Sequence, residues 1–300
     1  MRILVTGAAG FVGQHMLRKL HETGHEPLGI DCASAPGVNA RFDLMDRKAL
    51  LTFVHETHPD AAIHLAAMSF IPDGDRYPKE MLDINVNGTI NLLDAFGTLT
   101  PRRRILLASS AQVYGKGEDS SDPLDEATPM CPFNYYAISK AAAELAALGR
   151  QAAGVCEVIM ARPGNHTGPG QSARFVVPAF IQQIRNCRDG KANQIEVGNL
   201  ESVRDFSDVR DVAAGYLALL EKGRPGCAYN LSANQHLRIG ELLDQLCAMF
   251  DLSPPRIMVP ERFRATDFAP RLDISRIQTD TGWNPVYRIA QTLQDMVADS

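Results

Sequence analysis

The feature that most constrains the fold lies near the N-terminus, where a short apolar run rich in branched residues ends in three evenly spaced glycines. The run covers residues 3–6, the glycines are Gly7, Gly10 and Gly13, and an amphipathic stretch over residues 14–20 follows. This pattern predicts a strand, a tight turn and the start of a helix. Gly7 permits the turn, Gly10 lets the backbone approach a pyrophosphate, and Gly13 lets the helix pack on the strand. Because a helix N-terminus attracts anions, the turn predicts a dinucleotide-binding site.

A second strand is predicted at residues 27–30, and it ends in Asp31, eighteen residues after Gly13. A carboxylate at this point accepts hydrogen bonds from the adenosine ribose hydroxyls and repels a 2′-phosphate. We therefore expect NAD as the cofactor, with NADP as the open alternative, while a loop-capping role is the structural alternative for Asp31. Asp43 ends a third short strand over residues 41–44, where it is expected to reach the adenine amino group or to serve as a turn carboxylate.

The composition is typical of a globular chain, with 300 residues of which 45% are hydrophobic and 22% charged, enough for one large or two modest cores. The net charge of −5 provides no basic stripe for nucleic acid. Six scattered cysteines form no Cys-x-x-Cys motif and no cluster with histidines, so no metal site is predicted. No apolar run approaches the roughly twenty residues that span a bilayer, and no signal peptide is evident. We expect a cytoplasmic protein without nucleic-acid or membrane partners.

Strand-like and helix-like runs alternate through the first half of the chain, a pattern typical of parallel strands joined by crossover helices. The predicted fold class is therefore α/β, with a doubly wound parallel sheet of the Rossmann type. Residues 61–67 are predicted to form a buried strand whose small final residues pass close beneath a cofactor, which places Leu65 and Ala66 at that site. His64 is interpreted as a packed core residue, and Asn85, within a helix predicted over residues 77–98, as a structural one.

Residues with catalytic potential follow in the middle of the chain. An apolar strand over residues 104–108 is followed by two serines, of which Ser110 lies at the sheet edge where parallel sheets bind ligands. Twenty-six residues after Ser110, Tyr136 lies in an alanine-rich stretch that predicts a helix. Lys140 is four residues further on, so the two side chains share one helix face. An ammonium beside a phenol lowers the pKa of the phenol toward neutrality, which would make Tyr136 a usable acid or base.

These features together resemble the extended short-chain dehydrogenase/reductase family. The family's glycine turn, its Ser or Thr, and its Tyr-x-x-x-Lys correspond here to Gly7/Gly10/Gly13, Ser110 and Tyr136/Lys140. The similarity covers nearly the whole chain. Residues 162–171 and 197–212 resemble the nucleotide-sugar members, above all the GDP-4-keto-6-deoxy-mannose reductase group.

The resemblance implies three sets of site residues. The catalytic residues are Ser110, Tyr136 and Lys140. The residues expected to contact the cofactor are Gly7, Gly10, Phe11, Val12, Asp31, Asp43, Leu65, Ala66, Tyr136, Lys140 and Pro163. The residues expected to contact the substrate are Ser110, Asn165, Arg204, Arg264 and Asp267. Asn165 and Arg204 are expected at the diphosphate, and Arg264 and Asp267 at the nucleoside ribose and diphosphate. For both arginines the structural alternative is a surface ion pair.

The chain departs from the reductase group at two positions. Gly164 stands where the group usually has an aromatic residue, which removes a packing face near the nicotinamide or the sugar. Asp31 stands where relatives that prefer NADP carry a basic or neutral residue. The expected nicotinamide form therefore follows from Asp31 and is not carried over from the group.

The reaction implied by the resemblance is hydride transfer at a sugar carbon, with Tyr136 exchanging the hydroxyl proton. Dehydratases of the family carry Asp-Glu or Ser-Glu after the catalytic Ser or Thr, whereas this chain has Ala111 and Gln112, which transfer no proton near neutral pH. We expect NAD(P)H-dependent reduction of the 4-keto group of a nucleotide-diphosphate 6-deoxyhexose. An NAD-dependent nucleotide-sugar 4-epimerase, which needs no additional groups, stays open as the alternative. A non-catalytic NAD sensor would not need Ser110, Tyr136 and Lys140 together.

The expected domains are an NAD(P)-binding Rossmann domain over residues 1–164 plus about 205–230, and a smaller α/β nucleotide-sugar-binding lobe over residues 165–204 and 231–300. In the family, the helix that carries the catalytic tyrosine and the helix before it pair with their copies in a second subunit. The small residues of 141–148 would allow such close helix approach, so the resemblance implies a homodimer.

Overall fold

A computed structural model of the chain describes residues 1–115, 123–259 and 271–299. Their contacts divide the chain into two compact units. The first unit comprises Met1–Pro163, Val212–Leu231 and Leu272–Asn284, and the second comprises Gly164–Asp211, Ser232–Arg271 and Pro285–Ser300. Within the described parts of the chain, every helix is too short or too polar to span a bilayer.

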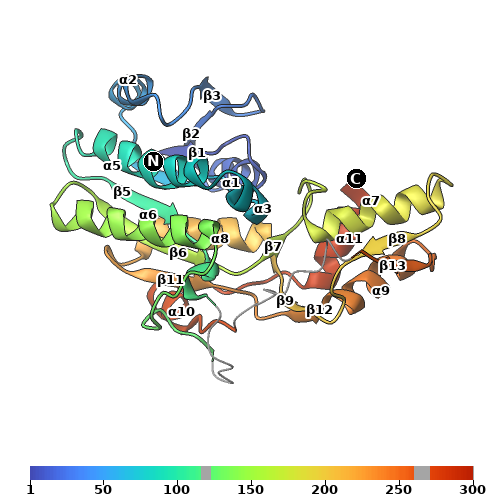
Figure 1. The fold of residues 1–300 in the computed structure, drawn as a ribbon. Helices are drawn as coiled ribbons and strands as arrows, with labels where there is room; N and C mark the ends of the chain where they lie inside the picture. The colour runs from blue at the N-terminus through green and yellow to red at the C-terminus, as the bar shows by residue number, and fades with distance from the viewer. Residues whose placement is uncertain (116–122, 260–270, 300) are drawn as a thin grey trace. The chain divides into compact units, whose positions relative to one another are not determined.

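The first unit is built on a sheet of seven parallel strands in the order β11-β6-β5-β4-β1-β2-β3 (Figure 1). The strands are β1 (Arg2–Thr6), β2 (Glu26–Asp31), β3 (Val38–Arg41), β4 (Ala61–His64), β5 (Arg104–Ala108), β6 (Glu157–Pro163) and β11 (Ala228–Leu231). The strand order reverses at β1, which pairs with β2 on one side and with β4 on the other. This is the order of a doubly wound Rossmann sheet, and it confirms the predicted fold class.

Helices cover both faces of this sheet. They are α1 (Phe11–Glu22), α2 (Arg47–Thr57), α3 (Ile71–Arg76), α4 (Pro78–Leu82), α5 (Gly88–Phe96), α6 (Tyr135–Ala152), α8 (Val209–Lys222) and α10 (Ser275–Thr281). Because side chains alternate along a strand, Ile3 and Val5 of β1 enter one core while Leu4 enters the other. The first core is completed by α1, α8 and α10, and the second by α2, α5 and α6 (Figure 1).

The helix predicted over residues 77–98 contains a π-helical segment, η1 (Asp83–Asn87), between α4 and α5. Asn85 at its centre is buried. Its side chain accepts a hydrogen bond from the Met68 N–H (2.8 Å) and donates one to the Ser139 hydroxyl (2.8 Å). The Thr89 hydroxyl donates to the Asn85 carbonyl (2.6 Å). These bonds agree with the structural role predicted for Asn85, whereas the π segment itself had no signal in the sequence pattern.

One segment lies in a different unit from the one predicted. Residues 231–300 were assigned as a whole to the second lobe, but Leu272–Asn284 belongs to the first unit. Ile277 and Trp283 are buried in the first core together with residues of α8. Arg276 Nη1 also donates a hydrogen bond to the carbonyl of Ala228 in β11 (3.0 Å). The apolar side chains of this segment therefore complete the sheet's core.

The described part of the second unit consists of three strand pairs and three helices. The pairs are β7 (His166–Thr167) with β10 (Ser207–Asp208), β9 (Val203–Asp205) with β12 (His236–Arg238), and β8 (Ile195–Val197) with β13 (Arg256–Met258). The helices are α7 (Val176–Arg188), α9 (Ile239–Met249) and α11 (Ile289–Asp299). All three helices contribute side chains to one apolar core, which includes Ile184, Leu246 and Leu293.

Candidate active site

The turn between β1 and α1 has a shape that only glycine allows. Gly7 has a φ of +70°, and a Cβ atom there would lie 2.7 Å from the backbone nitrogen of Ala66. A Cβ atom on Gly13 would lie 2.1 Å from the Gly7 carbonyl oxygen. Both distances are far below van der Waals contact. The backbone that follows β4 therefore lies directly against the turn, and α1 begins close beneath it.

The N-terminus of α1 fits an anionic group. Gly10 is the N-cap and makes no side-chain capping hydrogen bond, and the first turn contains no acidic residue. Phe11 and Val12 provide the first backbone positions of the helix. A helix end with this composition favours negative charge, because its amide dipoles add and its own first turn carries no carboxylate. The turn therefore fits the pyrophosphate of a dinucleotide.

The two aspartates predicted at the cofactor site have different surroundings. The Asp31 carboxylate, at the end of β2, accepts hydrogen bonds from the backbone N–H groups of Ala9 and Ala33, both at 2.9 Å. Its negative charge is therefore held beside the glycine turn. Asp43, after β3, is exposed and accepts a hydrogen bond from the Met45 N–H at 2.9 Å. This is the turn-carboxylate arrangement that the sequence left open, and contact with adenine stays a prediction.

The three predicted catalytic residues come together in the structure. Ser110 follows β5 and caps a short helix, η2 (Ala111–Tyr114), by accepting a hydrogen bond from the Gln112 N–H (3.2 Å). Tyr136 and Lys140 lie on the first turns of α6, and Lys140 Nζ is 6.0 Å from the centre of the Tyr136 ring. Hydrogen bonding by the Ser110 side chain acts to lower the pKa of the Tyr136 phenol, which places the two groups near each other. The three side chains are thus close together, as the predicted proton transfer requires. Their catalytic roles stay predictions.

Burial dominates the charge states of this cluster. It raises the pKa of the Tyr136 phenol above its ordinary value, against a smaller lowering effect of the hydrogen bond with Ser110. Burial also lowers the pKa of the Lys140 ammonium to about 8, and the Glu144 carboxylate acts in the opposite direction. The expectation that Lys140 would bring the phenol pKa toward neutrality is wrong here, because the loss of water around the phenol raises this pKa and the opposing effect comes from Ser110. A phenol with a raised pKa keeps its proton at neutral pH.

A chain of buried hydrogen bonds connects the β1 end of the glycine turn to α6. His64 of β4 lies between two hydroxyls, with Nδ1 2.7 Å from Thr6 Oγ1 and Nε2 3.0 Å from Thr89 Oγ1. From Thr89 the chain continues through η1 to Ser139, whose hydroxyl donates to the Tyr136 carbonyl (2.8 Å). Burial lowers the pKa of His64 to about 3, so the imidazole bridges the two hydroxyls as a neutral group.

A second buried polar network was missed by the sequence analysis. Glu144 of α6 pairs with Arg162 of β6 at 2.7 Å, with side chains only 1% and 7% exposed. The Ser109 hydroxyl donates a hydrogen bond to the Glu144 carboxylate, and Arg162 Nη1 donates one to the Tyr114 hydroxyl (3.0 Å). A signal was present in the sequence. Glu144 follows Lys140 by four residues on one helix face, and Arg162 interrupts an apolar strand.

The remaining predicted residues lie apart from this cluster in the chain. Pro163 is buried at the end of β6 in the first unit. Asn165 and Arg204 belong to the second unit, where the Asn165 carbonyl accepts a hydrogen bond from the Ser207 N–H (2.9 Å) and Arg204 lies in β9. Their contact with a diphosphate stays a prediction. Arg264 and Asp267 lie outside the described residues.

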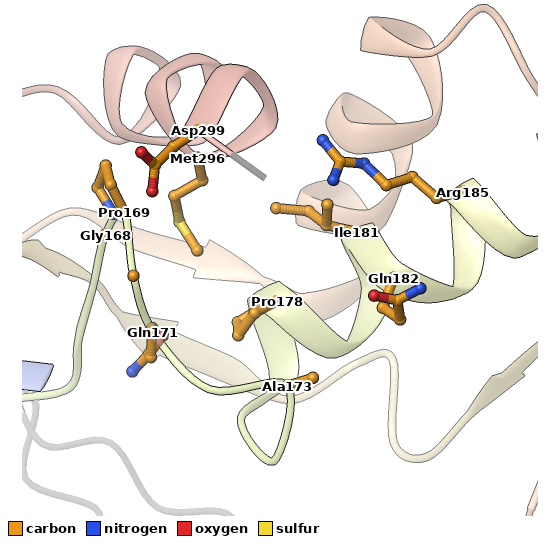
Figure 2. Close-up of a pocket in the computed structure, with 11 residues that line it drawn as sticks. Gly168, Pro169, Gln171, Ala173, Pro178, Ile181, Gln182, Arg185, Met296 and Asp299 are labelled. Carbon is orange, nitrogen blue, oxygen red and sulfur yellow. The ribbon is translucent and has the colours of Figure 1, made fainter. Parts of the chain in front are cut away.

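The second unit also contains a cavity of about 130 Å³ (Figure 2). It is lined by residues 168–171, by α7 and by α11, and Figure 2 shows Ile181 and Met296 directed toward the space between these segments. None of the predicted site residues lines it. The cavity is smaller than the roughly 300–1,000 Å³ of pockets that enclose small organic ligands. Side-chain chemistry therefore places the candidate active site at Ser110, Tyr136 and Lys140.

The chain is similar to several known proteins along most of its length. GDP-6-deoxy-D-mannose reductase of Pseudomonas aeruginosa is 37% identical over 300 residues, which cover 99% of this chain and 96% of the relative. GDP-6-deoxy-D-talose 4-dehydrogenase of Aggregatibacter actinomycetemcomitans is 31% identical over 82% of this chain and 79% of its own. The solved structure of RMD from Pseudomonas aeruginosa complexed with NADPH matches with a TM-score of 0.88 at 35% identity, covering 99% of this chain and 98% of that one.

A family model, described as the NAD dependent epimerase/dehydratase family, matches residues 3–232. The match spans the glycine turn, the serine after β5, and the tyrosine and lysine of α6. It confirms the family resemblance predicted from these motifs. The chain belongs to the NAD dependent epimerase/dehydratase family.

Proposed function

We propose that this protein reduces the 4-keto group of a nucleotide-diphosphate 6-deoxyhexose, using a reduced nicotinamide dinucleotide. The observation that carries the proposal is the cluster of Ser110, Tyr136 and Lys140 at the carboxyl edge of the sheet whose first turn fits a pyrophosphate. Two relatives with 37% and 31% identity are named for GDP-linked 6-deoxyhexoses, which supports a GDP-sugar as substrate.

Each residue of the cluster has a distinct part in this reaction. Reduced nicotinamide, when bound, supplies the hydride that reaches the ketone carbon. The Ser110 hydroxyl orients the ketone oxygen, and Tyr136 gives its phenolic proton to that oxygen as the alcohol forms. Lys140 Nζ donates a hydrogen bond to the Ala108 carbonyl (2.8 Å), which holds the ammonium near the phenol. Its positive charge stabilises the phenolate that remains after proton transfer.

The assay that tests this function uses the purified protein with GDP-4-keto-6-deoxy-mannose and either NADH or NADPH. We expect absorbance at 340 nm to fall in proportion to the ketone consumed, and NMR to show a GDP-6-deoxyhexose as product. The alternative, an NAD-dependent nucleotide-sugar 4-epimerase, predicts bound NAD that denaturation releases, no net absorbance change, and interconversion of 4-epimers. Interconversion of 4-epimers without net consumption of NADH or NADPH would replace the reductase by the epimerase as the proposed function.

We infer from Asp31 that NADH is preferred, although the related structure from Pseudomonas aeruginosa contains NADPH. Replacing Asp31 with Asn is expected to raise kcat/KM for NADPH relative to NADH about tenfold, because the fixed negative charge that repels a 2′-phosphate is lost. The amide oxygen retains the hydrogen bond from the Ala9 N–H. Initial rates with both cofactors measure this ratio. Asp251→Asn, the same charge change at an exposed residue of the second unit, is the matched control and should leave the ratio unchanged. An unchanged ratio in Asp31→Asn would contradict the assignment.

We also propose that the first unit binds the cofactor, that the second unit binds the nucleotide sugar, and that the enzyme works as a cytoplasmic homodimer. Helix α6 exposes Ile138 and Leu145, with Leu145 59% accessible, which supports a partner for this helix. The six cysteines are free, which supports a reducing compartment. Light scattering should give twice the 32.8 kDa of one chain, and a monomeric mass would refute the dimer.

A further inference from the structure

The pair of Glu144 and Arg162 is buried and joined by several hydrogen bonds. Arg162 Nε lies 3.0 Å and 3.2 Å from the two carboxylate oxygens of Glu144, and Nη2 lies 2.7 Å from Oε2. The Ser109 hydroxyl donates a further hydrogen bond to the carboxylate. Withdrawing two charges from water is costly, and apolar residues of similar volume often stabilise a fold as well or better. The pair is therefore better explained by a role in the site than by stability alone.

The pair connects the structural elements that carry the reactive side chains. Helix α6 is bonded to the end of β5 at two successive residues, through Lys140 to the Ala108 carbonyl (2.8 Å) and through Glu144 to the Ser109 hydroxyl. The next residue along the chain is Ser110. Loss of the Glu144 carboxylate would remove one of these two bonds and change where Ser110 lies relative to α6.

Arg162 extends the connection to two further elements. Its Nη1 donates to the hydroxyl of Tyr114, the last residue of η2, and that hydroxyl donates to the Asn230 side chain of β11 (2.7 Å). The centre of the Arg162 guanidinium also lies 5.0 Å from the centre of the Tyr114 ring. Arg162 therefore fixes the Glu144 carboxylate from β6 and prevents it from turning away from Ser109.

The charged and titratable groups around Lys140 make Glu144 the counterpart of its ammonium. On α6, Tyr136 precedes Lys140 by one turn and Glu144 follows it by one turn, and the Glu144 carboxylate favours the charged lysine. On β4, burial and the positive charge of Lys140 both lower the pKa of His64, so its imidazole is neutral. Arg162 on β6 acts on Lys140 through Glu144, to which it is bonded.

We propose that Glu144 and Arg162 are positioning residues of the reaction, which fix Ser110 against α6 and hold the Lys140 ammonium charged beside Tyr136. This inference rests on the proposed function, since it assigns the pair to the same reaction centre. Neither residue touches the reacting atoms in the proposal, and both act through Ser109, Ser110 and Lys140.

The test compares variants that separate charge from shape. Glu144→Gln keeps the shape and removes the charge, so the pKa of Lys140 should fall. In the proposal, activity requires protonated Lys140, and kcat therefore declines as this lysine loses its proton. The midpoint of that decline should move toward lower pH by about one pH unit. For a midpoint that moves from about 8 to about 7, kcat at pH 8 falls about fivefold from this shift alone.

Two further variants isolate geometry. Glu144→Asp keeps the charge and shortens the reach, and Ser109→Ala removes one hydrogen bond without changing charge. Both should lower kcat at every pH and leave the midpoint of the pH profile near that of the original protein. Asp208→Asn, which removes another buried carboxylate paired with an arginine, is the control for lost stability. It should lower the melting temperature without moving the midpoint.

A second measurement does not require turnover. The ¹³Cε resonance of Lys140, identified by its loss in Lys140→Met, reports the titration of this lysine in the cofactor-free protein. We expect a lower titration midpoint in folded Glu144→Gln and an unchanged one in Ser109→Ala. An unchanged midpoint in folded Glu144→Gln overturns the inference, whatever the activity. Absence of reductase activity in the unsubstituted protein overturns the proposed function and leaves the electrostatic part of the inference measurable.

Discussion

Replacing Tyr136 with Phe should lower kcat about 10³-fold, a loss in the range measured when a positioned general acid is removed. The phenol is the group whose proton the reaction consumes, and burial keeps its pKa raised so that the proton is present. Phe retains the ring packing near Lys140, so dissociation constants for NADH and for the nucleotide sugar should change little. Steady-state assays at 340 nm together with calorimetric titration of the cofactor separate the two effects.

The matched comparison for Tyr136→Phe is Ser110→Ala. This change removes a hydroxyl that orients the ketone oxygen but leaves the proton donor in place, so its loss of kcat should be smaller. If Tyr136→Phe retains turnover close to that of the original protein, proton donation must be assigned to another group. If Tyr136→Phe loses cofactor binding completely as well as turnover, the substitution has instead disturbed the fold.

Replacing Gly13 with Ala should abolish dinucleotide binding and lower the free energy of unfolding by about 3 kcal/mol, the upper part of the range for overpacked sites. The added Cβ atom would lie 2.1 Å from the Gly7 carbonyl oxygen and 2.8 Å from Ala8 Cα. Both are backbone atoms that no rotamer change can move, so α1 must shift away from the turn. Denaturant unfolding and cofactor titration measure the two consequences.

Gly149 provides the control for this substitution. It is an exposed glycine in α6, and a Cβ atom there would meet nothing within 4 Å. Gly149→Ala should leave cofactor binding intact and raise the stability of a single chain by about 0.5–1 kcal/mol, because alanine is the better helix former. Gly149 lies one turn after Leu145 on α6, so light scattering of this variant checks that the proposed dimer is retained. A Gly13→Ala protein as stable as the original and still able to bind NADH would show that the turn tolerates a side chain.

The elements of the first unit could be predicted because their signals are local. Apolar runs such as residues 61–64 mark buried parallel strands, and the spacing of Gly7, Gly10 and Gly13 marks a strand, turn and helix within a dozen residues. Tyr136 and Lys140 likewise share a helix face by spacing alone. In each case the physical cause lies within a few residues of its effect.

The features that sequence reasoning missed depend on contacts between distant segments. The partners of Glu144 come from β6 and from the residue after β5, and Trp283 enters the first core from far along the chain. The pKa of Tyr136 was predicted in the wrong direction for the same reason. Helix spacing reveals the neighbouring ammonium, whereas the surroundings that exclude water come from other elements of the fold.

The division of the chain between its two units has a consequence for how the protein is made. The chain crosses from one unit to the other after Pro163, Asp211, Leu231, Arg271 and Asn284. Strand β11, which pairs with β6, and the segment containing Trp283 therefore leave the ribosome after much of the second unit. Domains usually fold in order of synthesis, but this sheet lacks its last strand until Leu231 has emerged, and its core lacks Trp283 until nearly the whole chain has emerged. A fragment that ends at Pro163 would leave β6 as an open sheet edge, so the cofactor unit is not separable by truncation.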